Sequence, residues 1–157
     1  MNIVYTVLIV IILLFVLAYW TRRRFGVLGL ALCAGYLLSG MWTEQVTPYI
    51  QKAGLVVVAP PLSSIVAALL ILLPAVLLLF SGPTYSKKLQ RIIGAAFFAL
   101  LAAAFLLAPL GNSMSLDDMG TFYYNLLADN KTVVITAAIV YALFDILTLK
   151  TPKLKEK

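Results

Sequence analysis

Asp145 is the residue of this chain whose type and position could support chemistry. It interrupts an otherwise uncharged stretch, 132–149, and a charged side chain at the centre of a membrane helix costs about 2.5–3.5 kcal/mol on insertion scales. Helical spacing places Asp145 on one face with Ala138, Tyr141 and Ala142, so we expect the carboxylate to point into a helical bundle. Two interpretations remain open. Asp145 is either an ion or proton site with Tyr141 as a hydrogen-bonding neighbour, or one half of a structural ion pair at the edge of the bundle.

Short basic clusters offer Asp145 a cationic partner, which a carboxylate near the C-terminus of its own helix needs. The candidates are Arg22, Arg23, Arg24, Lys87, Lys88 and Arg91. Two roles fit these loops as a group. They bind anionic lipid or a cytoplasmic protein, or they only fix the orientation of the chain in a membrane.

Residues for most kinds of catalysis and metal binding are missing from the sequence. There is no histidine, and Cys33 is the single cysteine, which excludes an internal disulfide and a Cys/His metal cluster. Paired carboxylates, a phosphate-binding loop and a dinucleotide fingerprint are also missing. We therefore expect a protein without enzymatic activity, metal or cofactor. A membrane-embedded enzyme would need a reactive group from another chain.

The composition indicates a membrane protein. Of the 157 residues, 63% are hydrophobic and 11% are charged, whereas soluble proteins carry about 25% charged residues. So few charges cannot cover a soluble globule, which excludes a soluble enzyme. The net charge of +6 is spread over short clusters between apolar runs, so we expect the lipid bilayer, and not nucleic acid, as its counterpart.

The elements that must position Asp145 are expected to be membrane-spanning helices in a single all-α membrane domain, 1–157. Five runs have roughly the 20-residue length that a bilayer core requires. They are about 2–20, 25–42, 62–81, 92–110 and 132–149. Small residues recur at helical spacing in the second and fourth runs, where we expect close packing between helices. These residues are Ala31, Gly35, Ser39, Ala95, Ala99 and Ala103.

The connections between the spans also carry signals. Pro60 and Pro61 break a long uncharged run and leave 55–59 as an interfacial or re-entrant piece. Apolar residues at helical offsets predict an amphipathic helix over about 115–129 in the outer interface. That helix either recognises a partner in the envelope or caps the bundle. The tail 150–157 is basic.

The distribution of basic residues predicts the orientation of the chain. With five spans, ten Lys and Arg residues fall on one side: Arg22, Arg23, Arg24, Lys87, Lys88, Arg91, Lys150, Lys153, Lys155 and Lys157. Lys52 and Lys131 fall on the other side. The positive-inside rule then places the N-terminus outside and the C-terminus in the cytoplasm, as in a multi-pass protein of the plasma (inner) membrane.

The segment Arg91-Ile92-Ile93-Gly94, after a polar loop and at the start of an alanine-rich helix, resembles the colicin V production protein family of small bacterial inner-membrane proteins. The order of elements is also similar over about residues 1–112. The chain departs from the family pattern at Gln90, where the family usually has Asp, at Phe98, where it has a second glycine, and at Leu101-Ala102, where it has an Arg-Gly pair. A fifth span with Asp145 also goes beyond the usual four.

Two functions follow as hypotheses. The first is a small non-enzymatic inner-membrane accessory or assembly protein, and the resemblance implies a link to toxin export or envelope maintenance. The second is a subunit of an ion-conducting or transport complex that uses Asp145. In both cases we expect the chain to associate with copies of itself or with other membrane proteins.

Overall fold

The computed structural model describes residues 3–54, 61–111, 125–126 and 128–148. Five α-helices are named in this part of the chain: α1 (Ile3–Thr21), α2 (Phe25–Lys52), α3 (Leu62–Phe80), α4 (Lys88–Gly111) and α6 (Lys131–Leu147). No strand occurs among the described residues, which confirms the all-helical architecture. The piece 55–59, the tail 150–157 and most of the amphipathic helix expected over 115–129 lie outside the described residues.

Among the residues that the structure describes, three helices are long and apolar enough to cross a membrane. They are Phe25–Lys52, Leu62–Phe80 and the part Lys88–Leu107 of α4. The protein is therefore a membrane-embedded helical bundle, as its composition predicts.

The helix α2 is longer than the expected span 25–42, because it continues to Lys52 with Pro48 inside it. Its 28 residues extend about 42 Å at 1.5 Å per residue, which exceeds a bilayer core of roughly 30 Å. The first charged residue after the apolar run is Glu44, which lies within α2. A charge limits the segment that lies in lipid but does not end a helix, so the helix and the span have different boundaries.

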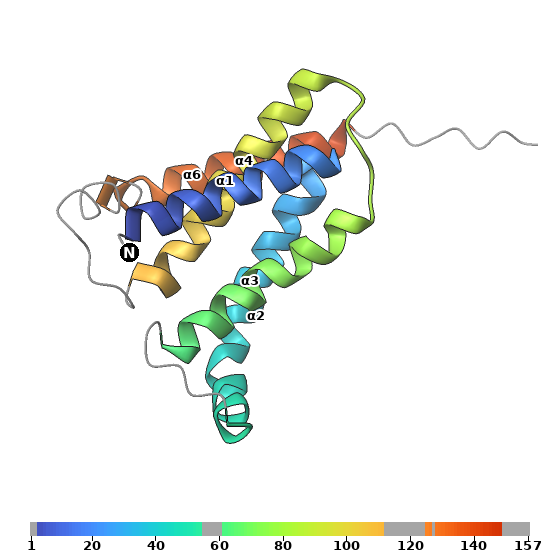
Figure 1. Ribbon diagram of the computed structural model, residues 1–157. Coiled ribbons are helices and arrows are strands. Elements are labelled where there is room, and N and C mark those ends of the chain that lie inside the picture. Colours follow the sequence, from blue (N-terminus) through green and yellow to red (C-terminus); the bar gives the residue numbers. More distant parts are fainter. Residues whose placement is uncertain (1–2, 55–60, 112–124, 127, 149–157) are drawn as a thin grey trace, which may run out of the picture.

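The helix α2 is the central element of the bundle, because it packs against α3, α6 and α4, while α1 packs mainly against α4 (Figure 1). The largest fully buried side chains come from the first half of α2 and from its neighbours. They are Phe25, Leu28, Leu32, Ile71, Leu79, Phe98 and Leu101. The core therefore sits where α2 crosses α3 and α4.

The small residues on α2 and α4 lie inside this core. Ala31, Gly35 and Ser39 are all buried on α2, and Ala95, Ala99 and Ala103 are buried on α4. At Gly35 the backbone of α3 comes so near that a Cβ atom would lie 2.9 Å from the Leu70 carbonyl oxygen and closer still to that of Ile71. Glycine here permits the close approach of α2 and α3.

Candidate functional site

The ends of α1, α3 and α6 and the beginnings of α2 and α4 meet at one end of the bundle, toward the right of Figure 1. Two loops join the helices there. The Arg24 N–H donates to the Pro83 carbonyl at 3.0 Å, and the Tyr85 N–H donates to the Arg22 carbonyl at 2.8 Å. We call this region, formed by loops 22–24 and 83–85 with Gly26, Arg91 and Asp145, the helix-end junction. It contains Asp145 and three of the basic residues that the sequence singles out, Arg23, Arg24 and Arg91.

Asp145 lies in the junction as a buried acceptor for the start of α2. Its side chain is 8% exposed, and Oδ2 accepts a hydrogen bond from the Gly26 N–H at 2.9 Å. Gly26 belongs to the first turn of α2, whose N–H groups have no partner within their own helix. The positive end of the α2 dipole and this N–H both favour a carboxylate at this place, which offsets much of the cost of burying the charge. Asp145 is therefore an N-terminal cap supplied by a different helix.

Arg24 provides the matching cap for the end of α6. Its Nη1 lies 3.9 Å from Asp145 Oδ1 and donates to the Asp145 backbone carbonyl at 3.1 Å. The Thr148 hydroxyl donates to the same carbonyl at 2.8 Å. A cation at a helix C-terminus is favourable, so α2 and α6 stabilise each other's ends through Arg24 and Asp145.

Two further arginines hold the ends of two further helices. Arg23 donates from Nε to the Leu79 carbonyl at 2.9 Å and from Nη2 to the Phe80 carbonyl at 2.8 Å, at the end of α3. Arg91 donates to the Tyr19 carbonyl near the end of α1, and its guanidinium lies 3.8 Å from the centroid of the Tyr19 ring. Arg23, Arg24 and Arg91 thus each satisfy carbonyls that a helix end leaves unpaired.

The other basic candidates, Arg22, Lys87 and Lys88, are exposed at the edge of the junction. Arg22 has a positive φ of 57°, a conformation that turns the chain sharply between α1 and α2. These three residues are not brought to Asp145.

Tyr85 is a junction residue that the sequence does not single out. It is buried, and its hydroxyl oxygen accepts a hydrogen bond from the Phe25 N–H at 3.1 Å. Its ring lies against Gly94, where a Cβ atom would come within 2.7 Å of it. The glycine of Arg91-Ile92-Ile93-Gly94 therefore makes room for a tyrosine that completes the capping of α2. Gly94 is the sequence feature from which the position of this tyrosine could have been inferred.

Tyr141 reaches the same region from α6 by aromatic packing. Its ring centroid lies 4.6 Å from that of Phe97 and 5.6 Å from that of Phe25. Its hydroxyl hydrogen-bonds with that of Tyr85. The Asp145 carboxylate accepts from the Gly26 N–H and also hydrogen-bonds with Tyr85. Tyr141 stands beside the carboxylate as a packed ring at the edge of a cavity.

The surroundings of Tyr85 predict a pH dependence. Burial raises the pKa of the Tyr85 hydroxyl well above its ordinary value; the Phe25 N–H opposes the shift, and the Asp145 charge adds to it. An unfolded tyrosine ionises near pH 10, so above this pH the unfolded state loses a proton that the folded state retains. The stabilisation is complete below about pH 10 and is lost as the pH rises further. We expect the free energy of unfolding in detergent to fall more steeply above pH 10 in the wild type than in Tyr85→Phe.

Tyr49→Phe is the matched control for this measurement, because Tyr49 is exposed on α2. It should keep the slope of the wild type. Equal slopes for Tyr85→Phe and the wild type would contradict the prediction.

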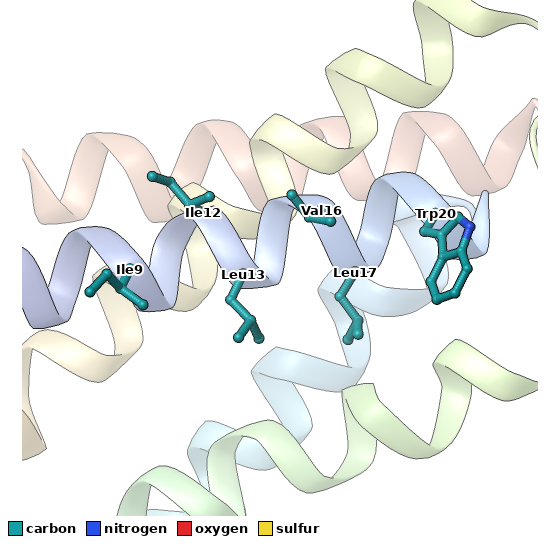
Figure 2. A pocket seen from close by; sticks show the side chains of 6 residues that line it. All are labelled: Ile9, Ile12, Leu13, Val16, Leu17 and Trp20. Atoms are coloured by element: carbon teal, nitrogen blue, oxygen red, sulfur yellow. The ribbon is translucent and has the colours of Figure 1, made fainter.

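Two cavities formed by described residues differ in the polarity of their lining. The junction cavity, of about 270 Å³, is lined by Arg24, Gln90, Tyr141, Phe144, Asp145 and Thr148. A second hollow of about 340 Å³ lies along α1, and Figure 2 shows its apolar lining, Ile9, Ile12, Leu13, Val16, Leu17 and Trp20. The polar lining makes the junction cavity the place where a ligand could be recognised, whereas the hollow on α1 offers only hydrocarbon contact.

Groups for metal binding are not brought together in the part of the chain that the structure describes, where no set of three His, Cys, Asp or Glu residues forms. Cys33 is a partly buried free thiol. The polar side chains of the junction form hydrogen bonds and an ion pair with the ends of the helices, and in this way they stabilise the fold.

The chain matches no protein-family model, and comparisons with curated proteins and with solved structures gave no match. Its function has to be inferred from the helix-end junction and from the surfaces of the bundle.

Proposed function

We propose that this protein is a non-enzymatic accessory or assembly factor of a bacterial inner membrane that supports toxin export or envelope maintenance. The observation that carries the proposal is the use of Asp145, the residue best suited to transport chemistry. Its carboxylate is buried on the Gly26 N–H, with Arg24 at 3.9 Å. A group held in this way stabilises the bundle. Because Asp145 then has a structural role, we propose that the chain acts by association with other proteins.

The arginines of the junction support the proposed topology of five spans with the C-terminus in the cytoplasm. Arg23, Arg24 and Arg91 all lie at the end where α1, α3 and α6 terminate. Basic residues on one side of the membrane favour the cytoplasmic side. In this arrangement α1 and α6 are the first and fifth spans.

Exposed apolar residues support association with a second copy or with other membrane proteins. Met41 and Trp42 are exposed at the end of the expected span 25–42, and Tyr49 is exposed on the part of α2 that continues beyond it. Apolar side chains outside the lipid are a common feature of protein interfaces. The link to export or envelope maintenance rests on the resemblance at Arg91-Ile92-Ile93-Gly94.

Transport through Asp145 is the second candidate function, because the junction cavity adjoins this carboxylate and Tyr141. Reconstitution of the full chain into liposomes tests both candidates. We expect no proton or potassium flux above that of empty liposomes under an imposed gradient. Flux that Asp145→Asn abolishes, and that Asp129→Asn at an exposed aspartate leaves intact, would establish transport and overturn the accessory function.

A positive test of the accessory function uses the native membrane. Purification in mild detergent after chemical cross-linking should retain a membrane protein in a fixed ratio to this chain. Trp42→Ser and Tyr49→Ser should weaken that association, and the equally exposed Leu77→Ser on α3 should not. A chain that purifies alone and unlinked would contradict the proposal.

A further inference from the structure

We propose that the junction cavity binds the headgroup of an aminophospholipid, a lipid that carries a phosphate and a primary ammonium group. The lining supplies one cation, Arg24, and one anion, Asp145, with the neutral polar groups of Gln90, Tyr141 and Thr148. A simple anion would be repelled by the carboxylate, and a simple cation by the guanidinium. A zwitterion satisfies both.

Both charged residues have hydrogen-bonding capacity left for such a ligand. Asp145 accepts from the Gly26 N–H at Oδ2 and hydrogen-bonds with the Tyr85 hydroxyl, while its Oδ1 lies 3.9 Å from Arg24 Nη1, which is longer than a hydrogen bond. Within the described part of the chain, the hydrogen bond of the Arg24 guanidinium comes from Nη1. A guanidinium carries five N–H donors, so Nε and Nη2 remain for a phosphate. A carboxylate has about four acceptor sites, so Asp145 can still accept from an ammonium group.

Neutral groups extend each half of the site. The side-chain amide of Gln90 can donate to a phosphate, whereas the oxygens of Tyr141 and Thr148 can accept from an ammonium group. Thr148 donates its hydroxyl proton to the Asp145 carbonyl, so its lone pairs remain for a second partner. Donors and acceptors are therefore present for both ends of the headgroup.

The position of the cavity fits a lipid better than a soluble metabolite. It lies at the end of the bundle where the arginines gather and three helices terminate, which is the depth of lipid headgroups in a membrane protein. Next to it, Val140, Phe144 and Leu147 are 61%, 63% and 83% exposed. Their spacing places them on one face of α6, where acyl chains can pack while the headgroup enters the cavity.

The size of the cavity agrees with this occupant. Its volume of about 270 Å³ corresponds to roughly nine water molecules at ~30 Å³ each. Phosphoethanolamine fits in this space, and the bulkier quaternary ammonium of choline adds volume and removes the N–H donors that Asp145 and Tyr141 would accept.

Native mass spectrometry of the full chain in detergent tests the proposal. The protein is titrated separately with phosphatidylethanolamine, phosphatidylcholine and phosphatidylglycerol that carry the same acyl chains. We expect phosphatidylethanolamine to bind about tenfold more tightly than the other two, as hydrogen bonds to charged groups predict. Equal affinities, or tighter binding of phosphatidylglycerol, would overturn the assignment.

Two variants locate the binding and keep Arg24 and Asp145, the charged caps of α6 and α2, in place. Gln90→Leu changes an exposed side chain, and Tyr141→Phe keeps the stacked ring and removes the hydroxyl. Each should weaken phosphatidylethanolamine binding about 2- to 10-fold. Tyr36→Phe is the control, because its ring stacks on Phe105 and does not line the cavity. Unchanged affinity in both test variants would show that the lipid binds elsewhere.

A competition with free phosphoethanolamine distinguishes a lipid from its soluble headgroup. We expect the free compound to displace the lipid weakly, because it lacks the acyl chains that pack beside Phe144. Equal affinity of the two would overturn the assignment to a membrane lipid.

Discussion

Asp145→Leu is expected to reduce the free energy of unfolding by about 3–5 kcal/mol, the cost of removing one partner of a buried pair. The substitution removes the acceptor of the Gly26 N–H and the counter-charge of Arg24, whose side chain is 18% exposed. It leaves the Gly26 N–H without an acceptor and the Arg24 guanidinium without a counter-charge at the point where α2 and α6 meet. Unfolding of the full chain by increasing denaturant in mild detergent measures the effect.

Asp145→Asn separates the two parts of this cost. Its side-chain oxygen can still accept from Gly26, while the charge facing Arg24 is lost. The free energy of unfolding of this variant should therefore lie between those of the wild type and of Asp145→Leu. The double variant Arg24→Leu with Asp145→Leu should lose less stability than the sum of the single variants, because neither charge is then left alone. Strictly additive effects would contradict the coupling of α2 and α6 through these residues.

The orientation of Asp145 could be inferred from the sequence, but its partner could not. Helical spacing puts Asp145 on the face of Ala138 and Ala142, and all three are buried in the bundle. The choice among six basic residues depends on tertiary contacts: Arg24 and Asp145 are 121 positions apart in the chain. Local periodicity carries no information about which of three adjacent arginines meets which helix end.

Composition predicts which part of a helix lies in lipid better than it predicts the residues at which the helix begins and ends. Apolar runs locate the membrane segments, yet α2 continues to Lys52 and α4 begins at Lys88, because charged residues are good helix formers once they leave the lipid. The role of Tyr85 could not be predicted from the sequence for a different reason. It lies in a loop without periodicity, and its role depends on the space that a distant glycine, Gly94, leaves open.

Gly35→Ala is expected to destabilise the bundle by about 1–3 kcal/mol, the usual cost of overpacking a well-packed contact. A methyl group there would meet the backbone carbonyls of Leu70 and Ile71 on α3, which cannot rotate away as a side chain can. Pro74 lies in the same helix and lacks the N–H that would bond the Leu70 carbonyl. This carbonyl lies next to Gly35, so α2 packs against α3 at its proline-modified turn.

Gly40→Ala on the same helix is the matched control, because a Cβ atom at Gly40 would have no neighbour within 4 Å. Alanine favours a helix over glycine by up to about 1 kcal/mol, so this variant should be neutral or slightly more stable than the wild type. The propensity gain is common to both substitutions, and the difference between the two variants therefore isolates the packing of α2 on α3. If Gly35→Ala were as stable as Gly40→Ala, the two helices would have to lie farther apart in the membrane than the close contact at Leu70 and Ile71 requires.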